Sequence, residues 1–161
     1  MKNNIYPRLK KFMIIITSFV IFYSAMSFNT MKKKECNSEQ LLSKGFDRLK
    51  KYSLIKGYPF SFNEKKKNKP VEYLKQIVTL NRGVKYKFFA VPNDDFEGQP
   101  VITIHNNEKQ EFLLATTYNF NFKKFYDEIN FECKTTGNYC LSFSFLDGKE
   151  GCAVGIMAFL E

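Results

Sequence analysis

Four cysteines carry the clearest covalent chemistry in this chain of 161 residues. They are Cys36, Cys133, Cys140 and Cys152. If the chain is exported, an even number of cysteines suggests up to two disulfides, with three complete connectivities. A zinc site is not predicted, because the sequence has no C-x-x-C spacing and only one histidine.

The strand pattern argues against a bridge between Cys133 and Cys140, although a predicted hairpin turn makes them neighbours. Alternation places Cys133 on the apolar face of its strand and Cys140 on the polar face of the next. Directly opposed residues in paired strands lie on the same face. We therefore predict a bridge between Cys36 and Cys152, which would tie the N-terminal helix to the last strand and bury Cys152 near the start of that strand. The other cysteines could stay free as buried thiols.

Motifs for catalysis are missing from the sequence. It has no nucleophile elbow, P-loop, H-E-x-x-H zinc motif or dinucleotide fingerprint. The single histidine, His105, could in principle serve a serine or cysteine nucleophile, which leaves a hydrolase as an outside hypothesis. It follows Ile104 at the end of a predicted strand, a position typical of an ordinary polar residue. We therefore predict no catalytic residues and no enzyme activity.

An acidic loop carries Asp94, Asp95 and Glu97. Carboxylate oxygens are ligands that Ca²⁺ prefers. Acidic residues beside proline and glycine are, however, typical of a solvated turn. We predict neither a metal nor a cofactor.

Aromatic residues are abundant, with 18 Phe and 9 Tyr but no Trp. The candidate partner surface is a cluster in and beside residues 119–125, where Asn and Lys interrupt the rings: Tyr118, Phe120, Phe122 and Phe125. If several of these rings face solvent, they form an apolar patch that suits a partner protein or a glycan. In the alternative interpretation, alternate rings fill the core. The lack of Trp weakens the glycan hypothesis, because sugar-binding sandwiches stack ligand rings on exposed Trp and Tyr.

The N-terminal residues 1–27 have the composition of a cleaved signal peptide. Four basic and no acidic residues precede an apolar run over residues 12–23, and an Ala-x-Ser pattern of small residues follows within residues 24–27. A short membrane anchor is the alternative, because residues 12–28 reach the lower limit for crossing a bilayer of about 30 Å.

Charge narrows the choice of partners. Removing residues 1–27 takes away four basic and no acidic residues, which lowers the formal net charge from +9 to +5. The remaining excess lies partly in lysine tracts at residues 32–34 and 65–69, which either bind an anionic partner or stay solvated. An exported protein rarely meets nucleic acid, so we predict no nucleic-acid partner. We predict membrane contact only if the N-terminal segment is retained.

The rest of the chain predicts one amphipathic helix followed by strands. Asn37 and Gln40 resemble a capping box, and apolar residues recur at helical spacing as far as residue 49. Residues 28–70 are therefore assigned to this helix and a lysine-rich loop, with Gly57 and Pro59 ending the helical region.

Period-two alternation begins near residue 71, and it predicts a mainly β protein. Residues 71–161 are expected to form an antiparallel, jelly-roll-like β-sandwich that makes one domain with the helix. The strand at residues 84–90 is expected to be half-buried, because Lys85 and Lys87 alternate with apolar residues. All the expected strands lie at residues 71–80, 84–90, 101–105, 112–117, 126–134, 138–146 and 152–160.

Two stretches carry a family resemblance: LNRGVKYKF at residues 80–88 and TGNYCLSFSFLDGKEGCAVG at residues 136–155. Together they resemble a family of small uncharacterised exported proteins of Bacteroidota-type bacteria, over roughly residues 36–161. The turn at residues 136–139 is also loosely similar to one that starts a late strand in the pre-peptidase C-terminal domains of secreted enzymes. The resemblance implies a jelly-roll-like sandwich and an envelope location, and it supplies no catalytic residues.

These features predict a non-catalytic exported protein of the periplasm or cell envelope, whose sandwich binds a partner protein or a glycan. The alternative is a membrane-tethered structural component of the envelope, held by an uncleaved segment at residues 12–28.

N-terminal sequencing of the exported product separates these two hypotheses. Signal cleavage predicts a first residue near Phe28, because the small residues that a signal peptidase accepts lie just before it. A product that still begins with Met1 would support the anchor instead.

Overall fold

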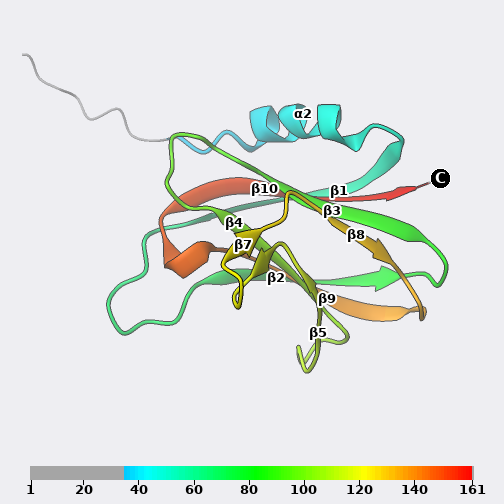
Figure 1. Cartoon of the computed structure of the whole chain (residues 1–161). Coiled ribbons are helices and arrows are strands. Elements are labelled where there is room, and N and C mark those ends of the chain that lie inside the picture. The colour runs from blue at the N-terminus through cyan, green and yellow to red at the C-terminus, as the bar shows by residue number, and fades with distance from the viewer. Residues whose placement is uncertain (1–34, 161) are drawn as a thin grey trace, which may run out of the picture. The chain divides into compact units, whose positions relative to one another are not determined.

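A computed structural model of the protein describes residues 35–160. The predicted signal peptide and the alternative anchor lie outside these residues. One α-helix precedes ten strands in the described part of the chain (Figure 1): α2 (Ser38–Leu49), β1 (Tyr52–Phe62), β2 (Tyr73–Leu80), β3 (Lys85–Pro92), β4 (Pro100–His105), β5 (Leu113–Thr116), β6 (Tyr118–Asn119), β7 (Lys124–Phe125), β8 (Ile129–Glu132), β9 (Gly137–Phe145) and β10 (Gly151–Leu160). Within residues 35–160, no helix has the length and apolar character needed to cross a membrane.

Eight of these strands form two antiparallel sheets of four strands each. Sheet A has the order β1-β10-β3-β8, and sheet B has the order β2-β9-β4-β5. The pairing is nested, because β1 pairs with β10, β2 with β9, β3 with β8 and β4 with β5. A long hairpin rolled into two facing sheets gives this order, which is that of an eight-stranded jelly roll. The predicted fold class is confirmed.

Side chains of the two inner faces meet in one core. Its fully buried members include Phe88 of β3, Ile102 and Ile104 of β4, and Leu141 of β9. Gly155 of β10 lies against the ring of Phe143, since a Cβ placed on Gly155 would come within 2.2 Å of that ring. Only a glycine lets the two sheets approach this closely here.

A second core lies between α2 and the outer face of sheet A (Figure 1). The helix begins as predicted, because the Asn37 side chain accepts a hydrogen bond of 3.0 Å from the backbone N–H of Gln40. Leu41 and Leu49 of the helix pack there with Phe89 of β3 and Ile156 of β10. The central strands of sheet A, β10 and β3, are therefore covered on both faces.

This cover corrects the prediction that β3 is half-buried. Lys87, expected to face water, is only 5% exposed. Its ammonium group lies 3.0 Å from a carboxylate oxygen of Glu128 and 4.7 Å from the centre of the Tyr52 ring. The ion pair and the ring contact compensate for the loss of water around the charge.

Strand β1 was not predicted, because Gly57 and Pro59 were interpreted as the end of the helical region. Both residues lie inside the strand, where Gly57 is paired with Ile156 and Pro59 with Val154 of β10. The strand tolerates proline because β1 is the edge of sheet A. At an edge, a residue without an N–H can face away from the ladder.

The turn between β8 and β9 was predicted as a hairpin and is instead a crossover. β8 belongs to sheet A and β9 to sheet B, so the two strands are not paired. Cys133 and Cys140 are both free and buried, so the predicted absence of a bridge between them is confirmed. The predicted reason was wrong, because it assumed that their two strands are paired. The partner of Cys140 on β4 is His105.

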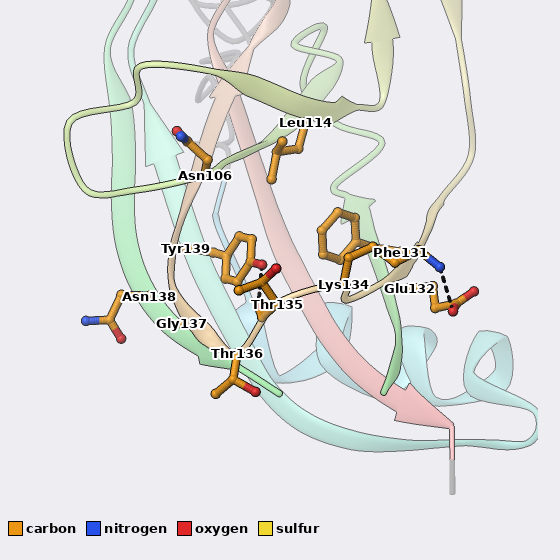
Figure 2. A pocket seen from close by; sticks show the side chains of 10 residues that line it. All are labelled: Asn106, Leu114, Phe131, Glu132, Lys134, Thr135, Thr136, Gly137, Asn138 and Tyr139. Carbon is orange, nitrogen blue, oxygen red and sulfur yellow. Dashed lines mark hydrogen bonds and ion pairs between the residues drawn. The ribbon is translucent and has the colours of Figure 1, made fainter. Parts of the chain in front are cut away.

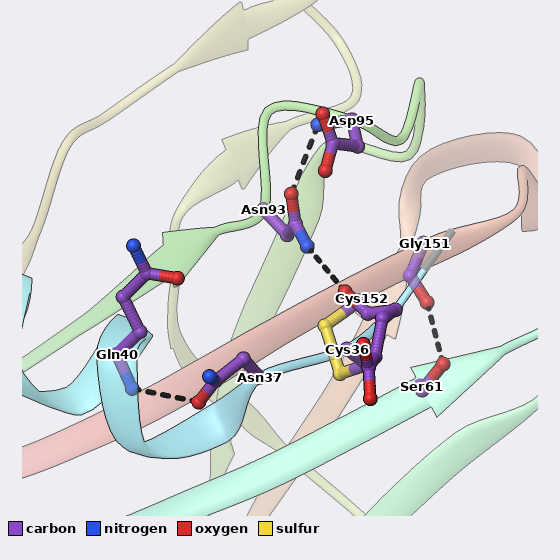
Figure 3. The surroundings of a disulfide bond; sticks show 9 residues. Cys36, Asn37, Gln40, Ser61, Asn93, Asp95, Gly151 and Cys152 are labelled. Atoms are coloured by element: carbon purple, nitrogen blue, oxygen red, sulfur yellow. Dashed lines mark hydrogen bonds between the residues drawn. A yellow bond between two sulfur atoms is a disulfide. The ribbon is translucent and has the colours of Figure 1, made fainter. Parts of the chain in front are cut away.

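The predicted disulfide between Cys36 and Cys152 is present (Figure 3). The two Cα atoms lie 5.7 Å apart, within the range that a disulfide spans. Cys152 is 1% exposed and is the second residue of β10, as predicted. Asn93 holds both sides of the bridge, because its backbone N–H donates to the Cys152 carbonyl and its side chain donates to the Glu35 carbonyl.

Loss of this bridge is expected to destabilise the fold strongly. The two cysteines are 116 residues apart in sequence, and closing so long a loop reduces the entropy of the unfolded chain. The double variant Cys36→Ala/Cys152→Ala should therefore lower the free energy of unfolding by up to about 4–5 kcal/mol. Guanidinium unfolding of the unaltered protein and of the double variant, each purified after export, measures this difference. Equal unfolding midpoints, or recovery of Cys36 and Cys152 as free thiols in non-reducing peptide mapping, would contradict the prediction.

Candidate functional site

Strands β6 and β7 form a short hairpin within the predicted aromatic surface. The turn between them is built by Asn119, whose side-chain oxygen accepts hydrogen bonds from the backbone N–H groups of Asn121 (3.0 Å) and Phe122 (3.1 Å). Lys123 completes the turn with a φ of 48°. Asparagine side chains commonly stabilise tight turns in this way. The backbone that carries the aromatic rings of this hairpin is therefore held in one conformation by the turn.

The four predicted surface residues divide into two groups. Tyr118 is buried, with 8% of its surface exposed, and its ring centre lies 4.6 Å from that of Phe125 and 4.9 Å from that of Phe120. Phe125 is half-buried. Phe120 and Phe122 are 65% and 78% exposed. We call these two residues the aromatic tip.

Sheet B holds the hairpin in place through Thr117. Its backbone N–H donates to the Ile102 carbonyl (2.9 Å), and its hydroxyl accepts from the Ile102 N–H (2.9 Å). Its carbonyl accepts from the backbone N–H of Tyr126 on the far side of the hairpin (2.8 Å). The aromatic tip is thus presented by a short hairpin whose two ends are bonded to each other at Thr117, and Thr117 is bonded to β4.

A groove of about 550 Å³ lies beside the edge strands β5 and β8 (Figure 2). Leu114 lines it from β5, Phe131 from β8 and Tyr139 from β9. The Tyr139 hydroxyl donates a hydrogen bond of 2.6 Å to the Thr135 carbonyl, and burial raises the pKa of the phenol above its ordinary value. This phenol is already engaged and stays protonated at neutral pH, so it does not provide a base.

His105 ends β4, as predicted, and lines a hollow of about 220 Å³ on the outer face of sheet B. Ser142 lines the same hollow, but its hydroxyl accepts a hydrogen bond from the side chain of Gln110. Among the buried side-chain nitrogen and oxygen atoms of residues 35–160, Nδ1 of His105 alone has no hydrogen-bond partner. A nucleophilic serine requires a hydrogen-bonded base, and that base requires an orienting group. The described residues do not assemble this arrangement.

Two residues of the acidic loop, Asp94 and Asp95, make separate interactions. Asp94 pairs with Lys44 at 3.6 Å, and the backbone N–H of Asp95 is held by the Asn93 side chain at 2.9 Å. No group of three or more metal-ligating side chains occurs within the described range.

Sequence analysis located the aromatic tip but missed the groove and the hollow. Both lie where strands distant in sequence meet, and their residues become neighbours only through the nested pairing. The hollow had one local signal, the alternating small polar residues Ser142 and Ser144 in β9. That signal shows which residues share a face and not what lies beside them.

Burial of His105 predicts a pH dependence of stability. Loss of water around the imidazole lowers its pKa from the ordinary value of 6.5, and a hydrogen bond with the Cys140 backbone opposes this shift in part. The unfolded chain therefore binds a proton more readily than the folded chain. The resulting stability is present above pH 6.5 and is lost as the pH falls through the folded pKa.

The variant His105→Gln should remove this part of the pH dependence, since the sequence contains no other histidine. Melting temperatures measured between about pH 7.5 and about pH 5 test it, because this range brackets an ordinary histidine pKa. As the pH is lowered over this range, the melting temperature should decrease less for the variant than for the unaltered protein. Parallel curves would show that His105 does not titrate differently in the two states.

No protein-family model matches this chain, and no curated protein matches it as a relative.

Proposed function

We propose that this protein is a non-catalytic exported protein of the cell envelope that binds a partner protein through the aromatic tip. The observation that carries the proposal is the exposure of Phe120 (65%) and Phe122 (78%) on a hairpin of defined backbone. Large aromatic side chains are enriched at the centres of protein interfaces. Burying each ring in a partner's pocket would stabilise a complex by about 1.5–3 kcal/mol.

Rigidity adds to this proposal. A partner that binds a flexible loop must offset the entropy lost when the loop becomes ordered. The Asn119 turn and the contact between Tyr118 and Phe125 already order this hairpin in the free protein. Phe120 also rests edge-on against Tyr118, so its orientation is largely set before binding.

Charge beside the aromatic tip favours an acidic partner surface. Lys123 and Lys124 follow Phe122 directly, and the Lys124 ammonium group lies 5.4 Å from the centre of the Tyr126 ring. Such rim charges mainly accelerate association and select partners of opposite charge.

The envelope location rests on two supports. The predicted signal peptide, residues 1–27, directs export. The Cys36–Cys152 disulfide is compatible with an oxidising compartment. A membrane-tethered structural component remains the alternative proposal, and the N-terminal sequencing described above distinguishes it.

Photo-crosslinking in the producing cells tests the proposed interface. A photoreactive phenylalanine analogue is placed at position 122 and, as a matched control, at Phe46, an exposed ring (50%) on α2. We expect a discrete crosslinked adduct from position 122 and none from position 46. The second-site change Phe120→Ser should reduce the adduct by about tenfold or more, because it removes one of the two anchors.

The same Phe120→Ser change should leave the melting temperature almost unaltered, since exposed positions contribute within about 0.5 kcal/mol to stability. Adducts of equal yield from positions 122 and 46, or an adduct that Phe120→Ser does not reduce, would contradict the proposal.

A further inference from the structure

The outer face of sheet B has no helix over it in the described part of the chain. Side chains of different size make this face uneven. Cys140, Ser142 and Ser144 point outward from β9, because Leu141 and Phe143 point into the core. These central residues are small. Register places larger side chains beside them: Tyr73 is paired with Ser144 on one flank, and His105 with Cys140 on the other. The face is therefore lower along β9 than along its neighbours.

A loop from the β4–β5 connection closes one end of this trough. Gln110, held at a φ of 59°, donates a side-chain hydrogen bond to the Ser142 hydroxyl. Lys75 of β2 donates to the Glu108 carbonyl in the same loop. The loop thus reaches across β9 to β2 and bounds the hollow of about 220 Å³.

The lining of the hollow is uncharged, although a quarter of the chain's residues are charged (25%). Its polar side chains are those of Tyr73, Thr103, Ser142 and Ser144, which carry hydroxyls, the Gln110 amide and the imidazole of His105. Burial lowers the pKa of His105, so its imidazole is neutral at physiological pH. Lys75 is not part of the lining, since its ammonium group is directed to the Glu108 carbonyl.

This lining defines the chemistry of a ligand. Hydroxyls and an amide both donate and accept hydrogen bonds, so they match a molecule rich in hydroxyl groups. An ion would find no opposite charge, and an apolar ligand would leave the hydroxyls without partners. Tyr73, 53% exposed, offers a ring face at one wall. The volume is below the roughly 300–1,000 Å³ of sites for drug-sized molecules, so it suits one small ring.

We propose that this hollow binds one neutral pyranose ring of a glycan, with Tyr73 against the sugar face and the hydroxyls of Thr103, Ser142 and Ser144 hydrogen-bonded to the sugar hydroxyls. The site is separate from the aromatic tip and shares no residue with it. A glycan and a partner protein can therefore be tested independently.

NMR titration of the exported, isotope-labelled protein tests this site. The probes are the methyl glycosides of glucose, galactose, mannose and N-acetylglucosamine, with glucuronate as a charged sugar of the same ring size. At least one neutral glycoside should shift the backbone amides of Thr103, Ser142 and Ser144, with a Kd on the order of 1 mM for so small a ligand. Glucuronate should bind clearly more weakly.

Matched variants separate stacking from folding. Tyr73→Ala should weaken binding about tenfold, whereas Tyr73→Phe, which keeps the ring, should retain it. Tyr126→Ala removes a ring of similar exposure (44%) elsewhere and should change nothing. Phe122→Ser, which disrupts the aromatic tip, should also leave sugar binding intact.

Several results would overturn the proposal. These are the absence of amide shifts with every neutral glycoside at about 50 mM, far above the expected Kd, shifts confined to other surfaces, tight binding of glucuronate, or equal affinity of Tyr73→Ala and Tyr73→Phe. None of these outcomes bears on the partner protein, because the aromatic tip is tested separately.

Discussion

Strand β10 must be covered on both faces, because every residue from Gly151 to Ala158 is buried. Its inner face packs against sheet B, where Gly155 admits the ring of Phe143. Its outer face carries Val154 and Ile156, which require α2 above them. A free helix of this length is marginal in water, so packing on β10 and the bond from Cys36 to Cys152 keep α2 in place. The order of sheet A, with β10 in the middle, follows from the same requirement.

Sheet B has the opposite character. Its edge strand β2 alternates, with Leu74 and Val78 toward the core and Tyr73 and Ile77 toward solvent. One covered face is enough for an antiparallel sheet. The outer face is therefore free to vary without loss of the core, and both proposed binding sites belong to it or to the hairpin attached to it.

The sequence predicts sheet B better than sheet A for this reason. Alternation marks a half-covered strand, so β2, β4 and β9 were located closely. β3 keeps an alternating sequence although both of its faces are covered, which explains why Lys87 was placed in water although it is buried beside Glu128. β1 was missed because Pro59 and Gly57 resemble a turn, and only its position at the edge of sheet A makes them acceptable.

The same distinction applies to the sites. The aromatic tip is local, because Asn119 and the rings on either side of it lie within one hairpin, so sequence could identify it. It could not tell that Tyr118 supports the tip and is not part of it, since that depends on contact with Phe125.

The hollow is non-local. Tyr73, Ser144 and His105 come from three strands, and they meet only because the nested pairing brings β2 and β4 to either side of β9. A shallow site of this kind needs a rigid floor, and β9 supplies one because its other face is fixed in the core by Leu141 and Phe143. The stiffness that sheet A and the disulfide give to the sandwich is therefore what allows the exposed side of sheet B to hold a defined shape.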